Sequence, residues 1–191
     1  MKDPISLGVY FLLAGVATVC AFSKEGFELV GTKAPEWELS EWFNSEPLSL
    51  KGLRGQVVLV RWWTGPECPY CAIAAPYLKA WYDTYRARGV EVIGIYHHKS
   101  SLPLTRRHVE QLVKWYGFQF PVAVDPGWRT LKRWWLTGGD QRWTSVSFLI
   151  DQQGIIRYIH PGGSYTKEEA EEMDAIIRDL LRHPQEKEGK P

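Results

Sequence analysis

Surplus charge and cysteine are both scarce in this sequence. The shortage of surplus charge excludes one class of protein. The 191 residues carry 23 lysines and arginines against 22 aspartates and glutamates, a formal net charge of +1. Such a balance creates no long-range field that would gather nucleic acid or an anionic membrane surface, so we set nucleic-acid binding aside. We find no internal repeat and no extended low-complexity tract. With 45% hydrophobic and 24% charged residues, the composition fits one globular domain with a core.

The first 22 residues have the pattern of an export signal. Lys2 gives a positive start, residues 5–22 are almost wholly apolar, and their end resembles a small-residue cleavage site. The apolar stretch is also just long enough to remain as a single membrane anchor. We therefore expect residues 1–22 to be a signal peptide or a membrane anchor, and the rest of the chain to be periplasmic or otherwise extracytoplasmic. Lipid attachment at Cys20 is disfavoured, because the bulky Val19 stands where a small residue is wanted.

Cleavage after Ala21 leaves two cysteines, Cys68 and Cys71, in the motif Cys-Pro-Tyr-Cys. Exported proteins hold stable disulfides, but a bridge across one helical turn closes a tiny loop and adds little stability. A zinc site needs four ligands, and apart from His97 and His98 no second pair is at hand. We therefore prefer a redox-active pair to an inert disulfide or a zinc site.

Hydrophobic patterning predicts an α/β domain over residues 28–183, followed by a charged, disordered tail at 184–191. A continuous apolar run at 56–63 predicts a strand buried on both faces, then a helix over 68–88 and a parallel strand at 90–96. The later patterns predict a helix with Val109 and Tyr116 on one face, a strand at 120–124 and a short helix at 128–136. An antiparallel hairpin is expected over 146–160. The last helix is expected to begin with a capping box of Thr166 and Glu169 and to run to about 181. The lead-in at 28–46 is expected to be a hairpin or irregular.

Cys68 is expected at the junction between the first strand and the helix. A thiol attacks a disulfide only as the thiolate, and an ordinary cysteine, with a pKa of about 8.5, is mostly protonated at neutral pH. Unpaired N–H groups and the helix dipole favour negative charge at this junction. Pro69 suits the first helical turn because it has no N–H to leave unpaired. We therefore predict that Cys68 attacks and that Cys71, one turn along, resolves the mixed disulfide.

Ten tryptophans are many for this length, and four of them form the adjacent pairs Trp62-Trp63 and Trp134-Trp135. The adjacent pairs lead us to expect one partly exposed ring in each. A tryptophan-rich face would suit a non-enzymatic binding module that keeps the cysteines as a passive disulfide. Packing in the core is the more common use of such rings.

The segment 57–76, VVLVRWWTGPECPYCAIAAP, resembles the thioredoxin-like fold, and in particular the exported TlpA-like and ResA-like thiol-disulfide oxidoreductases of the redoxin family. In that family a buried strand, an aromatic pair and a small residue precede the cysteines. A proline after the second cysteine, here Pro76, kinks the active-site helix. The resemblance extends over residues 29–183 and implies a three-layer sandwich, a mixed central sheet flanked by helices.

The resemblance implies that the chain exchanges disulfides with exported proteins, with Cys68 as nucleophile and Cys71 as the resolving cysteine. The walls of the site would then be Trp63, Pro69, Tyr70, Pro76, Ser145 and Val146. The partners would be a protein substrate that carries a disulfide or a dithiol, and an upstream redox partner. No prosthetic cofactor and no metal is implied.

Two positions depart from the family pattern, and a third differs from cytoplasmic thioredoxin. Ser145 stands in place of a cis-proline, and since a non-proline cis bond costs about 2.5–4 kcal/mol we expect a trans peptide there. Loss of that proline permits iron–sulfur or other metal binding in thioredoxin-fold relatives, a secondary hypothesis here. Glu67 replaces a tryptophan beside the nucleophile and is expected to be solvated, because a carboxylate aimed at the thiolate would oppose it. Arg61 or Trp62 stands where cytoplasmic thioredoxin has a buried aspartate. Arg61 is expected to be packed or at the surface, although its charge would favour a thiolate if it faced the turn.

A peroxiredoxin-like peroxidase on the same fold is the rival enzyme. Such enzymes need a threonine or serine three residues before the reactive cysteine, whereas Gly65 holds that place and Thr64 lies one residue too early. His97 and His98, at the end of the second strand, would either shuttle protons for the site or only begin a loop.

Overall fold

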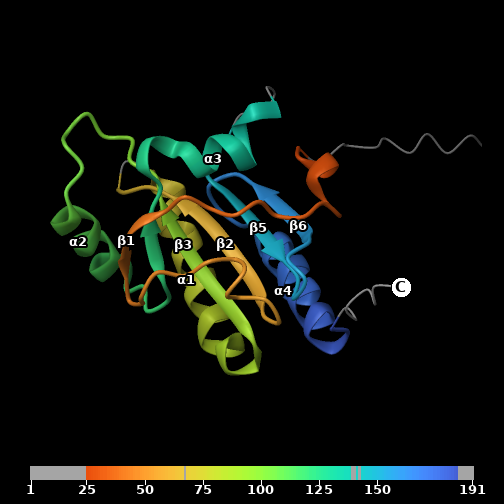
Figure 1. The fold of residues 1–191 in the computed structure, drawn as a ribbon. Coiled ribbons are helices and arrows are strands. Elements are labelled where there is room, and N and C mark those ends of the chain that lie inside the picture. Colours follow the sequence, from red (N-terminus) through yellow and green to blue (C-terminus); the bar gives the residue numbers. More distant parts are fainter. Residues whose placement is uncertain (1–24, 67, 139–140, 142, 185–191) are drawn as a thin grey trace, which may run out of the picture.

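The computed structural model describes residues 25–66, 68–138, 141 and 143–184 (Figure 1). The signal or anchor predicted for residues 1–22, the solvated Glu67, and the predicted tail beyond Pro184 lie outside the described residues. The strands are β1 (Ser40–Phe43), β2 (Val57–Trp63), β3 (Val90–Tyr96), β4 (Val122–Val124), β5 (Val146–Ile150) and β6 (Ile156–Pro161), and the α-helices are α1 (Pro69–Tyr85), α2 (Arg106–Tyr116), α3 (Arg129–Trp134) and α4 (Lys167–Arg182). In this part of the chain, no helix combines the length and the apolar character needed to cross a bilayer.

Strand β2 lies inside a six-stranded mixed sheet with the order β1-β4-β3-β2-β5-β6. It runs parallel to β3 and antiparallel to β5, and β5 and β6 form the predicted antiparallel hairpin. Every residue of β2 is buried. The predicted central strand is therefore confirmed, and so is the parallel β2-α1-β3 unit that carries the cysteines at its first turn.

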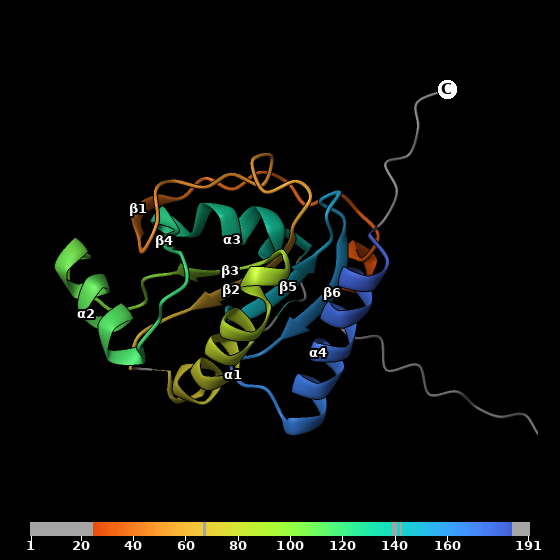
Figure 2. The ribbon, with the colours of Figure 1, turned by 90° about the horizontal axis from the view of Figure 1, so that it is seen from below.

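Helices cover both faces of this sheet and give the fold three layers (Figure 2). α1 and α4 lie against one face, where they pack on Val57, Leu59 and Trp63 of β2. α3 and the segment that leads into β1 lie against the other face, over Val58 and Trp62. This alternation of neighbouring side chains is the ordinary pattern of a strand buried on both sides. The predicted α/β three-layer sandwich is confirmed.

The expectation of one exposed ring in each tryptophan pair is wrong. Trp62, Trp63, Trp134 and Trp135 are all buried. Trp62 meets Trp134 edge to face at 5.4 Å between ring centroids, and Trp63 meets Tyr96 in the same way at 5.2 Å on the opposite face. Because helices cover both faces of the sheet, the rings of Trp62 and Trp63 enter different core layers and neither reaches water, whereas Trp134 and Trp135 are both buried in the layer on the α3 side.

The predicted helix starts and stops hold to within a few residues. α1 has Cys68 as its N-cap and Pro69 at its first position, and after a short 3-10 turn (Arg86–Arg88) the chain turns at Gly89, whose φ is 91°. α4 begins with the predicted capping box, in which Thr166 accepts from the N–H of Glu169 and the Glu169 carboxylate accepts in return. The helix predicted over 128–136 is shorter, since a 3-10 turn (Pro126–Trp128) precedes α3 and another (Leu136–Gly138) follows it.

The lead-in before β2 is irregular and does not form a hairpin. After the 3-10 turn η1 (Phe27–Leu29), it contributes β1, which pairs antiparallel with β4, far along the sequence. Positive φ values at Glu41 (46°) and Asn44 (64°) interrupt its backbone. Since local residues offer β1 no hairpin partner, its position depends on the sheet edge, a long-range contact that no local pattern reveals.

Candidate active site

The turn between β2 and α1 positions the two cysteines. The N–H of Cys68 donates to the carbonyl oxygen of Gly65 at 3.0 Å, and the N–H of Cys71 donates to the carbonyl oxygen of Cys68, also at 3.0 Å. Cys68 has extended backbone angles, as an N-cap residue does, while Cys71 already belongs to the helix. The first cysteine thus stands at the positive end of the helix dipole and the second lies one turn inside.

The two thiols differ in exposure. Both are reduced; Cys68 is half-buried, whereas Cys71 is only 4% exposed. Burial raises the pKa of Cys71 from 9.0 to about 11, although the N–H of Thr64, 3.5 Å from its Sγ, opposes the rise. At neutral pH Cys71 is therefore a protonated thiol. This asymmetry suits an accessible attacking thiol and a protected one that acts afterwards.

A cavity of about 260 Å³ opens beside the half-buried sulfur. Its lining residues are Cys68, Pro69, Tyr70, Lys99, Trp143, Thr144, Ser145 and Gly163. They come from the helix start, the end of β3, the approach to β5 and the loop before α4. The structure thus brings four predicted site residues together here, namely Cys68, Pro69, Tyr70 and Ser145.

The other predicted wall residues lie elsewhere around the turn. Trp63 is buried against Tyr96 in the core beneath α1, Val146 is buried in the core on the α3 side, and Pro76 lies inside α1. None of the three lines the cavity. Side chains alternate in direction along a strand and rotate around a helix, so residues near the cavity in sequence can still point away from it.

Sequence reasoning missed Lys99, Trp143, Thr144 and Gly163 as cavity residues. Lys99 follows the end of β3, and the carboxyl ends of parallel strands lie at one edge of a sheet, so topology was a usable signal for it. Trp143 stands two residues before Ser145, in the loop that the family resemblance places opposite the cysteines. Gly163 carries no chemical group that a motif search would find.

Ser145 has the trans peptide that we expected. The described residues contain no cis peptide bond. The carbonyl oxygen of Ser145 accepts the N–H of Gly162 at 2.9 Å, and the residue is 5% exposed. This carbonyl oxygen therefore already has a partner on the side of the loop before α4.

Arg61 is packed inside the protein, and it lies on the α1 side of β2. Its side chain is fully buried, with one terminal nitrogen 3.1 Å from Ser147 Oγ and the other 2.6 Å from the carbonyl oxygen of Gly163. The guanidinium lies 5.2 Å from the centroid of the Tyr165 ring, a cation–π distance. Its positive charge also acts to lower the pKa of Cys71.

The histidines at the end of β3 are placed differently from each other. His97 is fully buried against Trp128, and burial, helped by Lys99, lowers its pKa to about 3, so the ring stays neutral at physiological pH. His98 contacts the hydroxyl of Tyr96 at 3.0 Å and the carbonyl oxygen of Leu102 at 2.7 Å. A neutral, enclosed His97 is a poor proton shuttle. Among the described residues, no group of three histidines, cysteines or carboxylates is arranged to hold a metal ion.

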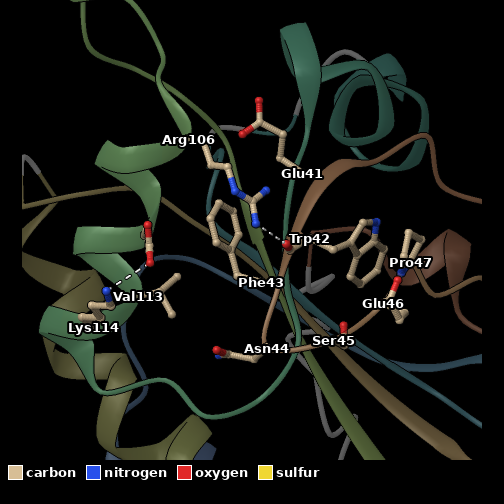
Figure 3. A pocket seen from close by; sticks show the side chains of 11 residues that line it. Glu41, Trp42, Phe43, Asn44, Ser45, Glu46, Pro47, Arg106, Val113 and Lys114 are labelled. Atoms are coloured by element: carbon tan, nitrogen blue, oxygen red, sulfur yellow. Dashed lines mark hydrogen bonds and ion pairs between the residues drawn. The ribbon is translucent and has the colours of Figure 1, made fainter.

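A larger cavity, of about 810 Å³, lies between β1 and α2 and contains neither cysteine (Figure 3). There the guanidinium of Arg106 lies 4.5 Å from the centroid of the Phe43 ring and donates to the carbonyl oxygen of Trp42 at 3.2 Å. Lys114 and Glu110 form an ion pair at 3.0 Å on the same helix. These charged groups on its wall thus already bond to other residues of the wall, and neither cysteine borders this cavity.

Comparisons with known proteins agree with this geometry. Residues 30–159 match the AhpC/TSA family. The chain is 32% identical over 152 residues to the thiol-disulfide oxidoreductase ResA of Bacillus cereus, which covers 79% of this chain and 80% of ResA. It is 29% identical over 166 residues to protein DipZ of Mycobacterium tuberculosis, but these residues are 85% of this chain and only 22% of DipZ.

Solved structures show the same fold. One is a protein from Chlorobium tepidum described as a thiol:disulfide interchange protein DsbE, with a TM-score of 0.64 and 25% identity over 80% of this chain and 97% of that one. Another is a thiol-disulfide isomerase from Corynebacterium glutamicum, with a TM-score of 0.62 and 28% identity over 78% and 96%. The family match spans the cysteine turn, the sheet and the loop of Ser145, and the ResA match covers most of both proteins. The chain therefore belongs to the AhpC/TSA family, in which it is a thiol-disulfide oxidoreductase of thioredoxin-like fold.

Proposed function

We propose that the protein exchanges disulfides with exported partner proteins, with Cys68 as the attacking cysteine and Cys71 as the resolving one. The observation that supports this most directly is the difference in exposure between the two thiols. Cys68 borders an open cavity, while Cys71 is 4% exposed and keeps its proton at neutral pH. A partner's disulfide therefore meets Cys68 first.

The helix start supports the role of Cys68. As N-cap of α1 it stands next to backbone N–H groups that have no partner within the helix, and α1 has no acidic side chain in its first turn. Both conditions favour a negative charge on the sulfur. The thiolate is the form that attacks.

The reaction has two exchange steps. In the first, the Cys68 thiolate attacks one sulfur of the partner's disulfide, a mixed disulfide forms, and the other partner sulfur leaves as a thiolate that takes up a proton from water. In the second, Cys71 loses its proton to water and attacks Sγ of Cys68, and the remaining partner sulfur leaves. The partner gains two electrons and this protein becomes a disulfide. An upstream redox partner then reduces it again, and the same steps run backwards oxidise a dithiol partner.

The cavity and its rim support a polypeptide as the partner. Tyr70 and Trp143 are about half exposed on its walls, Ile73 is 52% exposed on the neighbouring turn of α1, and Lys99 adds a positive charge. Half-exposed aromatic side chains are the kind that anchor polypeptides at interfaces. The pattern of residues 1–22 supports a periplasmic or other extracytoplasmic location, with that segment as signal or anchor and residues 28–183 as the exported domain.

Trapping tests this proposal. A Cys71→Ser protein expressed in its native compartment accumulates mixed disulfides on Cys68 that thiol reagents release, whereas the matched Cys68→Ser protein accumulates none. A Cys71→Ser protein that captures nothing contradicts the proposal. Peroxide consumption that survives Cys71→Ser, in place of trapping, would identify a peroxidase. A disulfide that resists reduction even in strongly reducing thiol buffers would indicate a passive bridge in a binding module.

A further inference from the structure

Arg61 is a buried cation in the interior of the sheet. An arginine keeps its charge in any protein, yet this side chain is fully enclosed. Two of its nitrogens donate to Ser147 and Gly163, while Nε has no acceptor. Within the described part of the chain, no carboxylate forms an ion pair with it. Since hydrophobic residues of similar volume commonly replace buried charges without loss of stability, packing alone is a poor reason for an arginine here.

Arg61 lies on the same side of β2 as the cysteine turn. Arg61 lies between Leu59 and Trp63 on the side of β2 that packs against α1, in the same layer as Cys71. The strand continues to Thr64, whose N–H donates to Cys71 Sγ at 3.5 Å. The Arg61 charge acts against the burial that raises the pKa of Cys71.

The same side chain fixes the surroundings of the turn. Arg61 holds the carbonyl oxygen of Gly163, and Gly163 lies directly against Tyr70, since a Cβ built on this glycine would be 2.5 Å from the Tyr70 Cβ. Its other bond, to Ser147, reaches the strand that follows Ser145. Arg61 thus connects β2, β5 and the loop before α4, all of which border the site.

The titratable and charged groups around Arg61 and Cys71 are Cys68 at the helix start, Tyr165 under the guanidinium, His160 on β6 with its partner Glu169, and His97 with Lys99 at the end of β3. Burial lowers the pKa of both His97 and His160, and Arg61 lowers each further. Both histidines are therefore neutral near pH 7, whereas Arg61 keeps its charge at every physiological pH.

We propose that Arg61 is a positioning residue for the resolving step: its guanidinium keeps a permanent positive charge beside Cys71 and favours the thiolate that cuts the mixed disulfide on Cys68. The proposal rests on the proposed function. In this step the Cys71 proton goes to water, a bond forms between the two cysteine sulfurs, and the bond from Cys68 to the partner's sulfur breaks. Arg61 takes up no proton, because a guanidinium has no lone pair available near neutral pH. It acts on the thiol through its charge, and not by taking up the proton as a buried carboxylate can.

Dithiobis-nitrobenzoate, an aromatic disulfide that releases a coloured thiolate, separates the two steps. With the reduced protein, attack by Cys68 releases one coloured thiolate and attack by Cys71 releases a second. Stopped-flow measurements over a range of pH give a rate and a pH midpoint for each release. The proteins to compare are the wild type, Arg61→Met, Arg61→Lys and, as a remote control on α2, Arg106→Met.

We expect Arg61→Met to move the midpoint of the second release to higher pH. Each unit by which the Cys71 pKa rises leaves tenfold less thiolate, but the thiolate is also more nucleophilic, so the second release slows about threefold per unit at neutral pH. Arg61→Lys keeps the charge and returns the midpoint to near the wild-type value. Arg106→Met changes neither release.

A folded Arg61→Met protein with the wild-type rate and midpoint for the second release overturns the proposal. If that protein does not fold, Arg61→Gln, which keeps an amide donor, serves as the neutral variant. If neither folds, Arg61→Lys decides, because a midpoint that rises although the charge is present contradicts the proposal and an unchanged one supports it. A wild-type protein that gives no second release instead counts against the exchange function itself, so the two failures are distinct.

Discussion

The backbone N–H of Thr64 donates to Sγ of Cys71 across 3.5 Å. The first residue after β2 therefore contacts the enclosed sulfur and leaves the half-buried sulfur of Cys68 to face the cavity. Burial still outweighs this hydrogen bond, since the pKa of Cys71 rises to about 11. The hydrogen bond from Thr64 thus reduces the rise in the pKa of Cys71 without removing it. The raised pKa should affect the stability of the protein as well as its reactivity.

We predict that the reduced protein loses stability in alkaline solution through Cys71. The pKa of this thiol is about 11 in the folded state against 9.0 for an ordinary thiol, so the folded state holds the proton more tightly. Its contribution is full below pH 9 and is lost as the pH rises toward 11. The free energy of unfolding should fall by up to about 3 kcal/mol over this interval. Urea unfolding under reducing conditions measures it.

The matched protein for this test is Cys71→Ser, which keeps the size of the side chain and loses the titration. Tyr85, whose pKa burial raises to about 12, affects both proteins equally at the highest pH. An equal loss of stability in both proteins between pH 9 and 11 would mean that Cys71 does not carry the effect.

Gly163→Ala should slow disulfide exchange while the protein stays folded. The added Cβ would come within 2.5 Å of the Tyr70 Cβ, so the loop before α4 or the cysteine turn must shift. We expect the rate of the first exchange step to fall by about tenfold, since small displacements of reacting groups are costly. Gly52→Ala, which meets only Ser49 Oγ at 3.2 Å far from the site, is the control. Equal rates for Gly163→Ala and Gly52→Ala would show that this close approach does not matter.

Trp143→Ala should weaken exchange with protein substrates and spare small disulfides. The ring is 46% exposed on the cavity wall, where a polypeptide would contact it. Loss of one such aromatic contact corresponds to about a tenfold lower kcat/KM for a disulfide-bearing protein. Trp115→Ala removes an even more exposed ring on α2, away from the cavity, and should change neither substrate. A matching loss with the small disulfide would point instead to a disturbed cysteine turn.

Thr166→Ala should lower stability without changing exchange. Thr166 accepts the N–H of Glu169 and so caps α4, and removal of such a cap costs about 1 kcal/mol. Thermal unfolding and the exchange rate, measured on the same protein, test the two halves of this prediction. A changed exchange rate at unchanged stability would contradict this prediction.

The parts of this protein that sequence could predict are those that local patterns determine. The apolar run of β2, the helix that starts at Pro69 and the capping box at Thr166 each depend on neighbours in the chain, and each was placed correctly. The antiparallel pairing of β1 with β4 and the burial of both rings in Trp62-Trp63 depend on which elements cover the sheet.

The same division applies to the candidate site. Cys68 and Cys71 could be recognised from spacing, because a helix start supplies their chemistry locally. Lys99, Trp143 and Gly163 reach the cavity from three distant segments, and Gly163 contributes only its lack of a side chain. The burial and orientation of the Arg61 side chain also depend on hydrogen-bond partners remote in sequence, Ser147 and Gly163.

Both edges of the sheet discourage the addition of a foreign strand. At one edge Glu41 within β1 and Asn44 directly after it have left-handed backbone angles, which break the regular row of hydrogen-bonding groups. At the other edge the N–H of Gly31 donates to the carbonyl oxygen of Ile156, and the N–H of Ile156 donates to that of Thr32. A regular, exposed sheet edge can pair with the strand of another chain, and interrupted or covered edges limit that risk. A polypeptide partner would then be held by the cavity wall and by its bond to Cys68, without strand addition, and the attack by Cys71 would break that bond.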